Sequence, residues 1–463
     1  MSDSIQFLFV LVVAPAVALF GATFVPGVRR GLRPVVLAAA TASAVAALAL
    51  LVAGLWIEGA GSFERVLLQG PADEALVRVD SLTLPLFPMA ALTWLCGLVI
   101  APARSFAADS ARRSSLAFLA MALAFATASP QFLAFLIAVA SLVFLLEHRR
   151  VERVRRVAGV YLSASLLLFV AGASLLAAGD GLESAGLWLI VAGLLVRKGI
   201  VPLHSWMPDV FERGHLVPAL LFNAPQVGTY AAAVIVLPSA PEGALTLIAV
   251  ASLITTLYGA LLAAVEPDTR RAFGYLFMSQ SALVLVGLGS GLENGVAGSL
   301  AVWVAAGLSM TGLGLTIAAL ELRRGRLSLR DHHGGYEQMP LLAASFLVFG
   351  LASVGFPGTL GFLGEELLIA GSVERFTFVG FVVVAATALN GVTVLKMYFS
   401  LFCGKPDGHP ALALRGRETA VFAVLAALLV AGGLFPKNLV DSRVDAAEAI
   451  LGAAAAETGG RGG

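Results

Sequence analysis

Residues 187–211 read LWLIVAGLLVRKGIVPLHSWMPDVF. The stretch begins as an apolar run typical of a membrane helix and leads directly into Arg197 and Lys198. Gly199 and Pro202 follow, and proline both removes a backbone donor and clashes with the preceding turn. Backbone that is broken at membrane depth is tolerated only where protein or water satisfies its polar groups. The stretch therefore predicts a broken membrane helix with two cations at the break.

The charges at this break support two interpretations. A charged side chain inside a bilayer is costly unless it is paired or hydrated, so Arg197 and Lys198 indicate an ion or proton path, with His204 as a candidate link beyond the proline. The alternative is a kinked helix whose Arg and Lys side chains extend to the cytoplasmic interface. Lys198 can carry a proton at neutral pH and release it when desolvated, whereas Arg197 stays protonated as a fixed charge.

A second break is expected in residues 352–371, ASVGFPGTLGFLGEELLIAG, at the pair Pro357 and Gly358. Glu365 and Glu366 follow this pair. Neighbouring residues on a helix are about 100° apart, so one carboxylate is expected to face a polar interior and the other a partner or the lipid headgroups. Two broken helices in the two halves of a chain, each with ionisable residues nearby, are typical of transporters built from inverted repeats.

A third candidate for the ion path is Lys396, in residues 387–404, and the alternative is that this side chain extends to the cytoplasmic end of its helix. His332 and His333 lie beside Asp331 in a loop, but no third ligand has a spacing typical of a metal site. We therefore expect no bound metal.

The composition of the chain indicates which class of protein it belongs to. Of the 463 residues, 59% are apolar and 13% are charged, whereas soluble domains average about 45–50% and about 25%. The formal net charge of +1 offers no field that would recruit nucleic acid. Cys96 and Cys403 cannot form a cluster or a disulfide framework, and no nucleotide motif or activated nucleophile is visible. These features predict an all-α, multi-pass membrane protein with no catalytic residues and no cofactor.

Apolar runs of about 20 residues, the length that spans a bilayer, predict about fourteen transmembrane helices. Charged residues, prolines and glycines separate them. The predicted ranges are 5–24, 34–56, 81–102, 114–129, 131–147, 157–178, 186–203, 217–238, 244–265, 273–291, 296–321, 341–371, 376–402 and 418–435.

The basic residues predict how the chain is threaded. Most Lys and Arg residues lie in the loops that follow the odd-numbered predicted helices. Short cytoplasmic loops carry this excess. Both termini are therefore expected on the non-cytoplasmic side of the inner (cell) membrane.

Four motifs resemble a known family. They are VRVDSLTLPLF (77–87), KGIVPLHSWMPDV (198–210), AAVEPDTRRAFGYLFMSQSAL (263–283) and ASVGFPGTLGFLGEELLI (352–369). The family comprises the antiporter-like subunits of respiratory complex I, which multisubunit sodium/proton antiporters, membrane-bound hydrogenases and DAB-type inorganic-carbon uptake systems share. The resemblance implies two inverted five-helix repeats, with helices seven and twelve broken, and proton movement along buried Lys, Glu and His side chains.

On this basis the chain is expected to have four parts. Three N-terminal helices carry an extramembrane hairpin at 57–80, two repeats follow, and a last helix precedes a short tail. The predicted boundaries are 1–110, 111–240, 241–404 and 405–463.

The chain departs from the family where the resemblance implies ionisable relay residues. A helix-five glutamate is expected where Ser141 stands, and a helix-seven lysine is expected where Arg197 stands. Glu365 occupies the place of a family carboxylate. The other relay positions hold residues that do not titrate, namely Phe222, Gln226, Ala306 and Met310.

Three functions follow as alternatives. The first is a membrane subunit that translocates or couples to protons, or another cation, in a complex related to NADH-quinone oxidoreductase or to an antiporter. The second is the membrane subunit of a DAB-type bicarbonate or CO2 uptake pair with a soluble zinc carbonic-anhydrase-like partner. The third is a non-conducting scaffold. The expected partners are the lipid bilayer, other membrane subunits and a soluble cytoplasmic protein that docks on loops 148–156 and 322–338.

Overall fold

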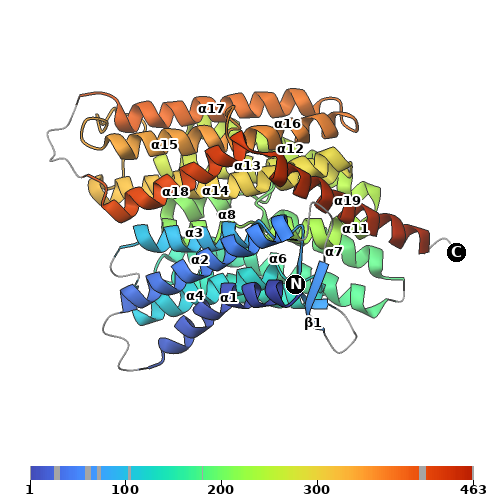
Figure 1. The fold of residues 1–463 in the computed structure, drawn as a ribbon. Helices are drawn as coiled ribbons and strands as arrows, with labels where there is room; N and C mark the ends of the chain where they lie inside the picture. The colour runs from blue at the N-terminus through green and yellow to red at the C-terminus, as the bar shows by residue number, and fades with distance from the viewer. Residues whose placement is uncertain are drawn as a thin grey trace. The chain divides into compact units, whose positions relative to one another are not determined.

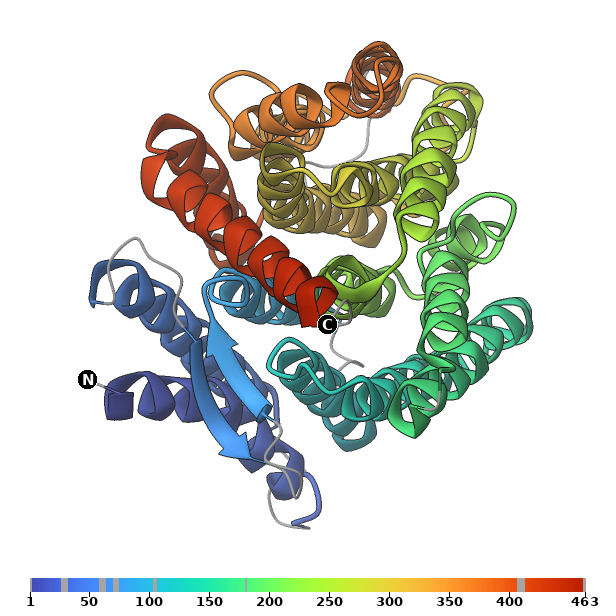
Figure 2. The same ribbon diagram turned by 90° about the vertical axis from the view of Figure 1, so that its right-hand side faces the viewer.

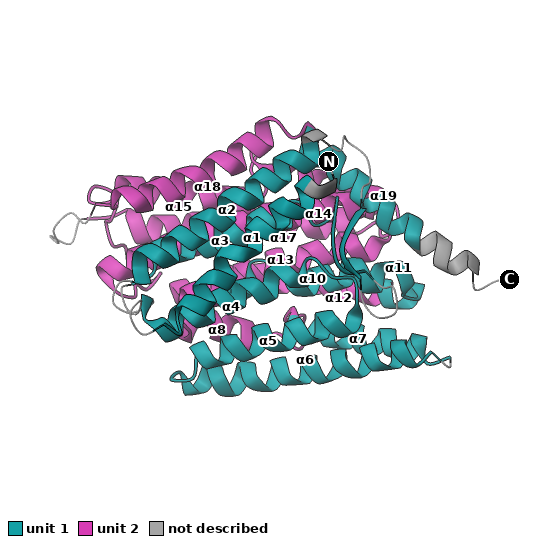
Figure 3. Ribbon diagram, turned by 60° about the horizontal axis from the view of Figure 1, so that its bottom comes forward, with its two compact units in different colours: residues 1–197, 221–245, 438–463 teal, residues 198–220, 246–437 magenta. Residues whose placement is uncertain are grey.

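The computed structural model describes residues 2–25, 32–57, 64–69, 75–102, 106–179, 181–405 and 413–460. The described chain is almost entirely helical (Figure 1). It forms two compact units, which Figure 3 colours separately. Unit 1 consists of Met1–Arg197, Leu221–Leu245 and Asn438–Gly463, and unit 2 consists of Lys198–Leu220 and Thr246–Lys437. The boundaries of the four predicted parts follow the expected membrane spans and stay a prediction.

Unit 1 is a set of helices that pack on their neighbours along the chain. Its helices α6 and α7 approach closely because each has a glycine at the contact: a Cβ on Gly172 would lie 2.6 Å from the carbonyl oxygen of Gly186. The helices of unit 1 are α1 (Ser2–Ala22), α2 (Leu32–Ile57), α3 (Leu86–Ile100), α4 (Ala108–Ala124), α5 (Pro130–Glu147), α6 (Glu152–Ala178), α7 (Glu183–Arg197), α10 (Val227–Ala231), the π-helix η2 (Ala232–Val236), α11 (Leu237–Ser239) and most of α19 (Lys437–Gly460).

A two-stranded antiparallel sheet lies in the segment that was expected to leave the membrane. Strands β1 (Glu64–Gln69) and β2 (Ala75–Asp80) pair with Glu64 opposite Asp80. Figure 2 shows the two arrows lying across the ends of the blue N-terminal helices. The side chain of Arg78 donates to Glu64 at 2.9 Å, which links the strands. The remainder of the predicted hairpin, 58–63 and 70–74, lies outside the described residues.

Helix α19 is held to the segment that follows β2 by one arginine. Arg443 is fully buried, and its Nη1 donates to the carbonyl oxygen of Leu82 at 2.9 Å. Its Nη2 donates to the carbonyl of Ser81 and, at 2.9 Å, to Ser442. A buried guanidinium is tolerated here because backbone oxygens satisfy several of its donors.

Unit 2 contains two helices whose apolar middle parts are wholly buried. All residues in the most apolar windows of α13 and α14 are buried. Around them, α15 and α16 follow one another along the side of α17 (Figure 1). The helices of unit 2 are α8 (Trp206–Arg213), most of α12 (Glu242–Val265), α13 (Thr269–Ser290), α14 (Glu293–Arg324), α15 (Pro340–Ser353), α16 (Leu360–Val373), α17 (Val379–Phe402) and α18 (Gly416–Leu434), while α9 (Leu216–Asn223) runs from unit 2 into unit 1.

The backbones of α14 and α16 touch along a row of glycines. A Cβ on Gly298 would lie 2.2 Å from the amide nitrogen of Leu368, and a Cβ on Gly371 would lie 2.1 Å from that of Gly295. Helices in a membrane associate through such small residues, because lipid leaves little hydrophobic driving force between them.

We expect Gly298→Ala to destabilise the protein by about 1–3 kcal/mol, because the new methyl group meets backbone that cannot rotate away. The control is Gly391→Ala in α17, where an added Cβ meets nothing within 4 Å. Thermal unfolding of the two purified variants measures the effect. Equal melting temperatures would show that the α14–α16 contact is looser than described.

Ten helices in the described part of the chain are long and apolar enough to cross a membrane. Two shorter apolar helices, α3 and α15, accompany them. The exact number of fourteen spans and the inverted repeats stay predictions. The ten are Ser4–Ala22, Leu32–Leu55, Pro130–Glu147, Glu152–Ala178, Leu216–Ser239, Glu242–Val265, Thr269–Ser290, Glu293–Arg324, Val379–Phe402 and Gly416–Leu434.

Candidate ion-translocation site

The first break follows α7 directly. Helix α7 ends at Arg197, residues 198–205 form turns, and α8 begins at Trp206. Gly199 has a φ of 65°, a left-handed conformation that glycine adopts without strain. The amide of Val201, which has left the helix, donates to the hydroxyl of Thr255 on α12 at 3.0 Å. The freed backbone is thus satisfied by protein, as membrane depth requires.

Arg197 lies at the end of α7 with a neutral partner. Its side chain is 7% exposed, and its Nη1 donates to Ser141 Oγ on α5 at 3.1 Å. The guanidinium also lies 4.8 Å from the centre of the Phe222 ring. Both of these partners, a hydroxyl group and an aromatic ring, are uncharged. The family resemblance implies a glutamate and a lysine at these two positions. The side chains at the two positions do touch in this chain, but they are Ser141 and Arg197.

Lys198 and His204 lie in the turns after α7. Lys198 is 4% exposed, so its ammonium-bearing side chain is enclosed by protein. The ring of His204 lies 5.0 Å from that of Tyr258 on α12, edge to face. The break therefore holds one buried amine and one imidazole, both of which can exchange protons.

The second break separates α15 from α16. Helix α15 ends at Ser353 and α16 begins at Leu360. Gly355 and Gly358 have φ values of 63° and 85°, so the chain turns through left-handed conformations on both sides of Pro357.

Only one of the two neighbouring carboxylates faces this break. Glu365 is 8% exposed, and its Oε2 accepts a hydrogen bond of 3.3 Å from the hydroxyl of Thr387 on α17. Its carboxyl group lies so close to Gly355 that a Cβ there would be 2.7 Å from the carboxyl carbon. Glu366, by contrast, is exposed. Glu365 is therefore the carboxylate placed to hold a proton or cation at the break.

Lys396 is engaged in a different role. Its Nζ donates to the carbonyl oxygens of Ala264 at 2.9 Å and Glu266 at 3.1 Å, at the end of α12. The last carbonyls of a helix lack intrahelical partners, and a cation there also interacts favourably with the helix dipole. These contacts favour a role in anchoring α17 to α12.

We expect Lys396→Met to cost about 1–2 kcal/mol of stability and to leave ion movement near the wild-type rate. Thermal unfolding and transport would be measured on the same preparation, with the exposed Lys405→Met as the control. Loss of transport with an unchanged melting temperature would instead place Lys396 in the path.

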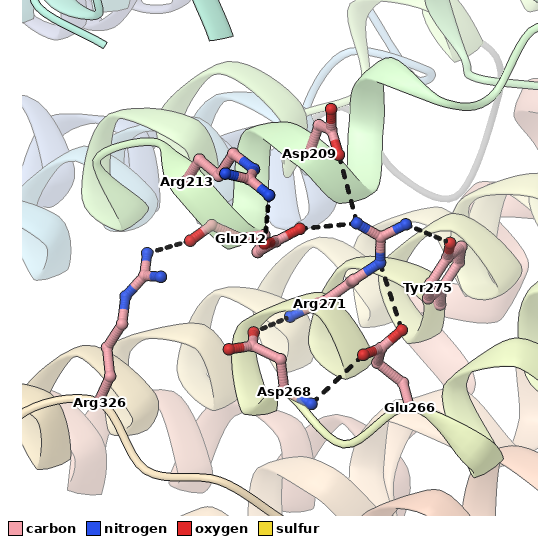
Figure 4. A network of polar contacts seen from close by, with 8 residues as sticks. All are labelled: Asp209, Glu212, Arg213, Glu266, Asp268, Arg271, Tyr275 and Arg326. Atoms are coloured by element: carbon pink, nitrogen blue, oxygen red, sulfur yellow. Dashed lines mark hydrogen bonds and ion pairs between the residues drawn. The ribbon is translucent and has the colours of Figure 1, made fainter. Parts of the chain in front are cut away.

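An arginine cluster at the start of α13 was not predicted (Figure 4). Arg271 contacts Glu212 at 2.7 Å, Asp209 at 3.3 Å and Glu266 at 3.2 Å, and it donates to the hydroxyl of Tyr275 at 3.1 Å. Asp209, Glu266, Arg271 and Tyr275 belong to two of the quoted motifs, and Glu212 lies just after the first of them. The acidic residues and arginines of these motifs were the available signal. The cluster joins α8, which follows the first break, to α13.

The two loop histidines make backbone contacts. His332 Nδ1 lies 3.1 Å from the carbonyl oxygen of Phe399, and His333 Nε2 lies 2.8 Å from that of Ser328. Within the described residues, no group of three His, Cys, Asp or Glu side chains could hold a metal.

Residues 156–390 match the family described as NADH:quinone oxidoreductase/Mrp antiporter, transmembrane. The chain belongs to this family. The predicted resemblance to antiporter-like subunits is thereby confirmed, and this family member is a multi-pass membrane protein.

One curated relative is NADH-quinone oxidoreductase subunit M of Pseudomonas aeruginosa. It is 28% identical over 290 residues, which cover 59% of this chain and 56% of the relative. The antiporter-like chain thus spans little more than half the length of the curated relatives that it matches.

Two solved structures extend the similarity over nearly the whole chain. One is the membrane-bound sulfane sulfur reductase, an archaeal respiratory membrane complex, with a TM-score of 0.86 and 16% identity over 96% of this chain and 98% of that chain. The other is respiratory complex I from Thermus thermophilus, with a TM-score of 0.82 and 23% identity over 96% and 99%. These similarities confirm the predicted all-α, polytopic membrane fold. They do not favour the inorganic-carbon alternative.

Proposed function

We propose that this chain is the antiporter-like membrane subunit of a larger respiratory or antiporter complex, in which it couples to the movement of protons or another small cation. The observation that carries the proposal is that each helix break encloses a titratable side chain, Lys198 at the first and Glu365 at the second. Ionisable groups inside a membrane are costly and mark ion paths by default.

In this proposal Arg197 has a different task from Lys198. Arginine stays protonated in proteins, so it holds a permanent positive charge and does not relay a proton. Hydrogen bonded to neutral Ser141, Arg197 provides the electrostatic background against which Lys198 gains or loses its proton.

The partners are proposed by analogy with the relatives, which are named as subunits of membrane complexes. Other membrane subunits contact this chain within the bilayer, and a soluble protein docks on the loops at 148–156 and 322–338. Arg149 and Arg150 are exposed in the first loop, which suits an acidic partner surface.

The test is isolation of the complex from native membranes through a tag on this chain, followed by identification of the partners and reconstitution into vesicles. We expect co-purifying membrane subunits and ion movement driven by the reaction of the complex. Recovery of the chain alone, without ion movement in any native preparation, would contradict the proposal and support the scaffold alternative. A carbonic-anhydrase-like partner would instead support inorganic-carbon uptake.

We further propose that both termini lie on the non-cytoplasmic side of the inner membrane, because the basic loops mark the cytoplasmic side. A reporter that is active only outside the cytoplasm is expected to work when fused after Gly463 and to fail when inserted at Arg150. The reverse pattern would invert the proposed topology.

A further inference from the structure

A cavity of about 640 Å³ lies at one end of unit 1, where the two strands, α11 and α19 come together (Figure 3). Its walls include the ends of membrane helices. Pro130 is the first residue of α5, Leu176 lies near the end of α6, and Ser239 is the last residue of α11. The cavity therefore lies where these spans end, which is the level of the lipid headgroups. Its volume is typical of a site for a small molecule.

The sheet and the helices line this cavity with different chemistry. The charged lining comes from the sheet, with Glu64 on β1 and Arg78 and Asp80 on β2. The helices contribute mainly apolar side chains. A ligand that fits both kinds of wall has a polar head and a hydrocarbon tail. The apolar lining includes Leu176, Leu187, Ile235, Pro238, Ala449 and Ile450.

The charged lining carries an excess of negative charge. Arg78 is shared between two carboxylates: its Nη1 donates to Glu64 Oε1 at 2.9 Å, and its Nε lies 3.4 Å from Asp80 Oδ2. One arginine between two carboxylates leaves one negative charge over. Glu64 is half-exposed, so its carboxylate can be reached by a ligand.

The nearest other arginine does not remove this excess. Arg443 is buried beside the cavity, and it interacts with Asp445 as well as with Asp80. Burial raises the pKa of the Asp80 carboxyl, although Arg78 and Thr83 both favour its charged form. A cationic group in the cavity would offset part of this cost of burial.

We propose that this cavity binds one molecule of phosphatidylethanolamine, with the ammonium group at Glu64 and Asp80 and the acyl chains along the apolar helix walls. A primary ammonium has three N–H donors for the carboxylate oxygens. The quaternary ammonium of phosphatidylcholine has none, and phosphatidylglycerol would bring a further negative charge. The bound lipid fills the space between the sheet and α19. This site goes beyond the proposed function and requires no ion movement.

The test uses a photoreactive phosphatidylethanolamine, with the reactive group in an acyl chain, in phosphatidylcholine nanodiscs that hold the intact complex. We expect labelled peptides from α7 and α19 that contain Leu187 or Ile450. Unlabelled phosphatidylethanolamine should compete about tenfold better than phosphatidylcholine or phosphatidylglycerol, because only its headgroup pairs with the carboxylates. Equal competition by the three lipids would overturn the proposal.

Two variants test the two kinds of wall separately. Glu64→Gln keeps the side-chain shape and removes the charge, and we expect it to weaken the labelling of these peptides about fivefold. Ala449→Phe places a ring in the cavity and should abolish the labelling. Unchanged labelling in both variants would overturn the site. Glu64→Gln decides the outcome if Ala449→Phe prevents assembly, because Glu64 is half-exposed and its replacement is nearly isosteric.

Each variant has a matched control. Glu152 is also an exposed glutamate paired with an arginine, Arg156, but it begins α6, whereas the cavity lies at the other end of that helix. Gly452 is on α19, and an added Cβ there meets nothing within 4 Å. Glu152→Gln and Gly452→Phe should both be labelled like the wild type. Labelling of a complex that moves no ions would count against the proposed function and leave the lipid site supported.

Discussion

Glu365→Gln is expected to abolish ion movement by the assembled complex, with a fall of at least about tenfold, or about 1.4 kcal/mol of barrier. Glutamine has nearly the same shape as glutamate and can still accept the hydrogen bond from Thr387, so the second break should fold normally. What it cannot do is take up and release a proton. Transport assays on vesicles that contain equal amounts of assembled complex measure the effect.

The neighbouring carboxylate provides a matched control. Glu366 has the same chemistry and lies on the same helix, but it is exposed. Glu366→Gln should therefore transport at close to the wild-type rate. If both variants transport normally, Glu365 is no part of an ion path, and the scaffold alternative gains support.

Lys198→Ala is expected to have an effect of similar size, because it removes the buried amine at the first break. A second variant, Lys198→Arg, separates loss of the exchangeable proton from loss of the positive charge. Arginine keeps the positive charge but does not release its proton at neutral pH, so this variant should assemble and still fail to transport. Transport and assembly would be measured together, the latter by co-purification of the partner subunits.

The control for this pair is Lys405→Ala, since Lys405 is an exposed lysine of the same unit. It should leave transport unchanged. Wild-type transport by Lys198→Arg would show that Lys198 serves as a fixed charge, and the proton relay would then have to lie elsewhere.

The helices of this protein could be predicted because a bilayer imposes a length and a polarity on each span. The α-helices at Pro130–Glu147 and Thr269–Ser290, for example, fall close to their predicted ranges of 131–147 and 273–291. The ends of helices were less predictable at the two helix breaks. The predicted helix 186–203 ends at Arg197, because Gly199 already adopts a left-handed conformation before Pro202 is reached.

The contacts of the candidate site were only partly predictable. Sequence singled out Glu365 and Lys198 because charge is conspicuous in an apolar run. It gave no sign that Lys396 contacts the end of α12, since the acceptor carbonyls lie more than a hundred residues away and any residue type could supply them. The hydrogen bond of 2.9 Å from Asn390 on α17 to Ser279 on α13 was not predictable for another reason: neutral polar residues are common in membrane helices, and the sequence does not show which of them meet.

The glycine contact between α14 and α16 limits how the second break can move. A Cβ on Gly298 would lie only 2.2 Å from the amide nitrogen of Leu368, so the two backbones are in direct contact and α16 cannot move closer to α14. We therefore expect conformational coupling at this break to come from the short link at 354–359 and from side-chain rotation, rather than from movement of α16 toward α14. A small inhibitor that stiffened this link would be expected to block transport without separating the helices.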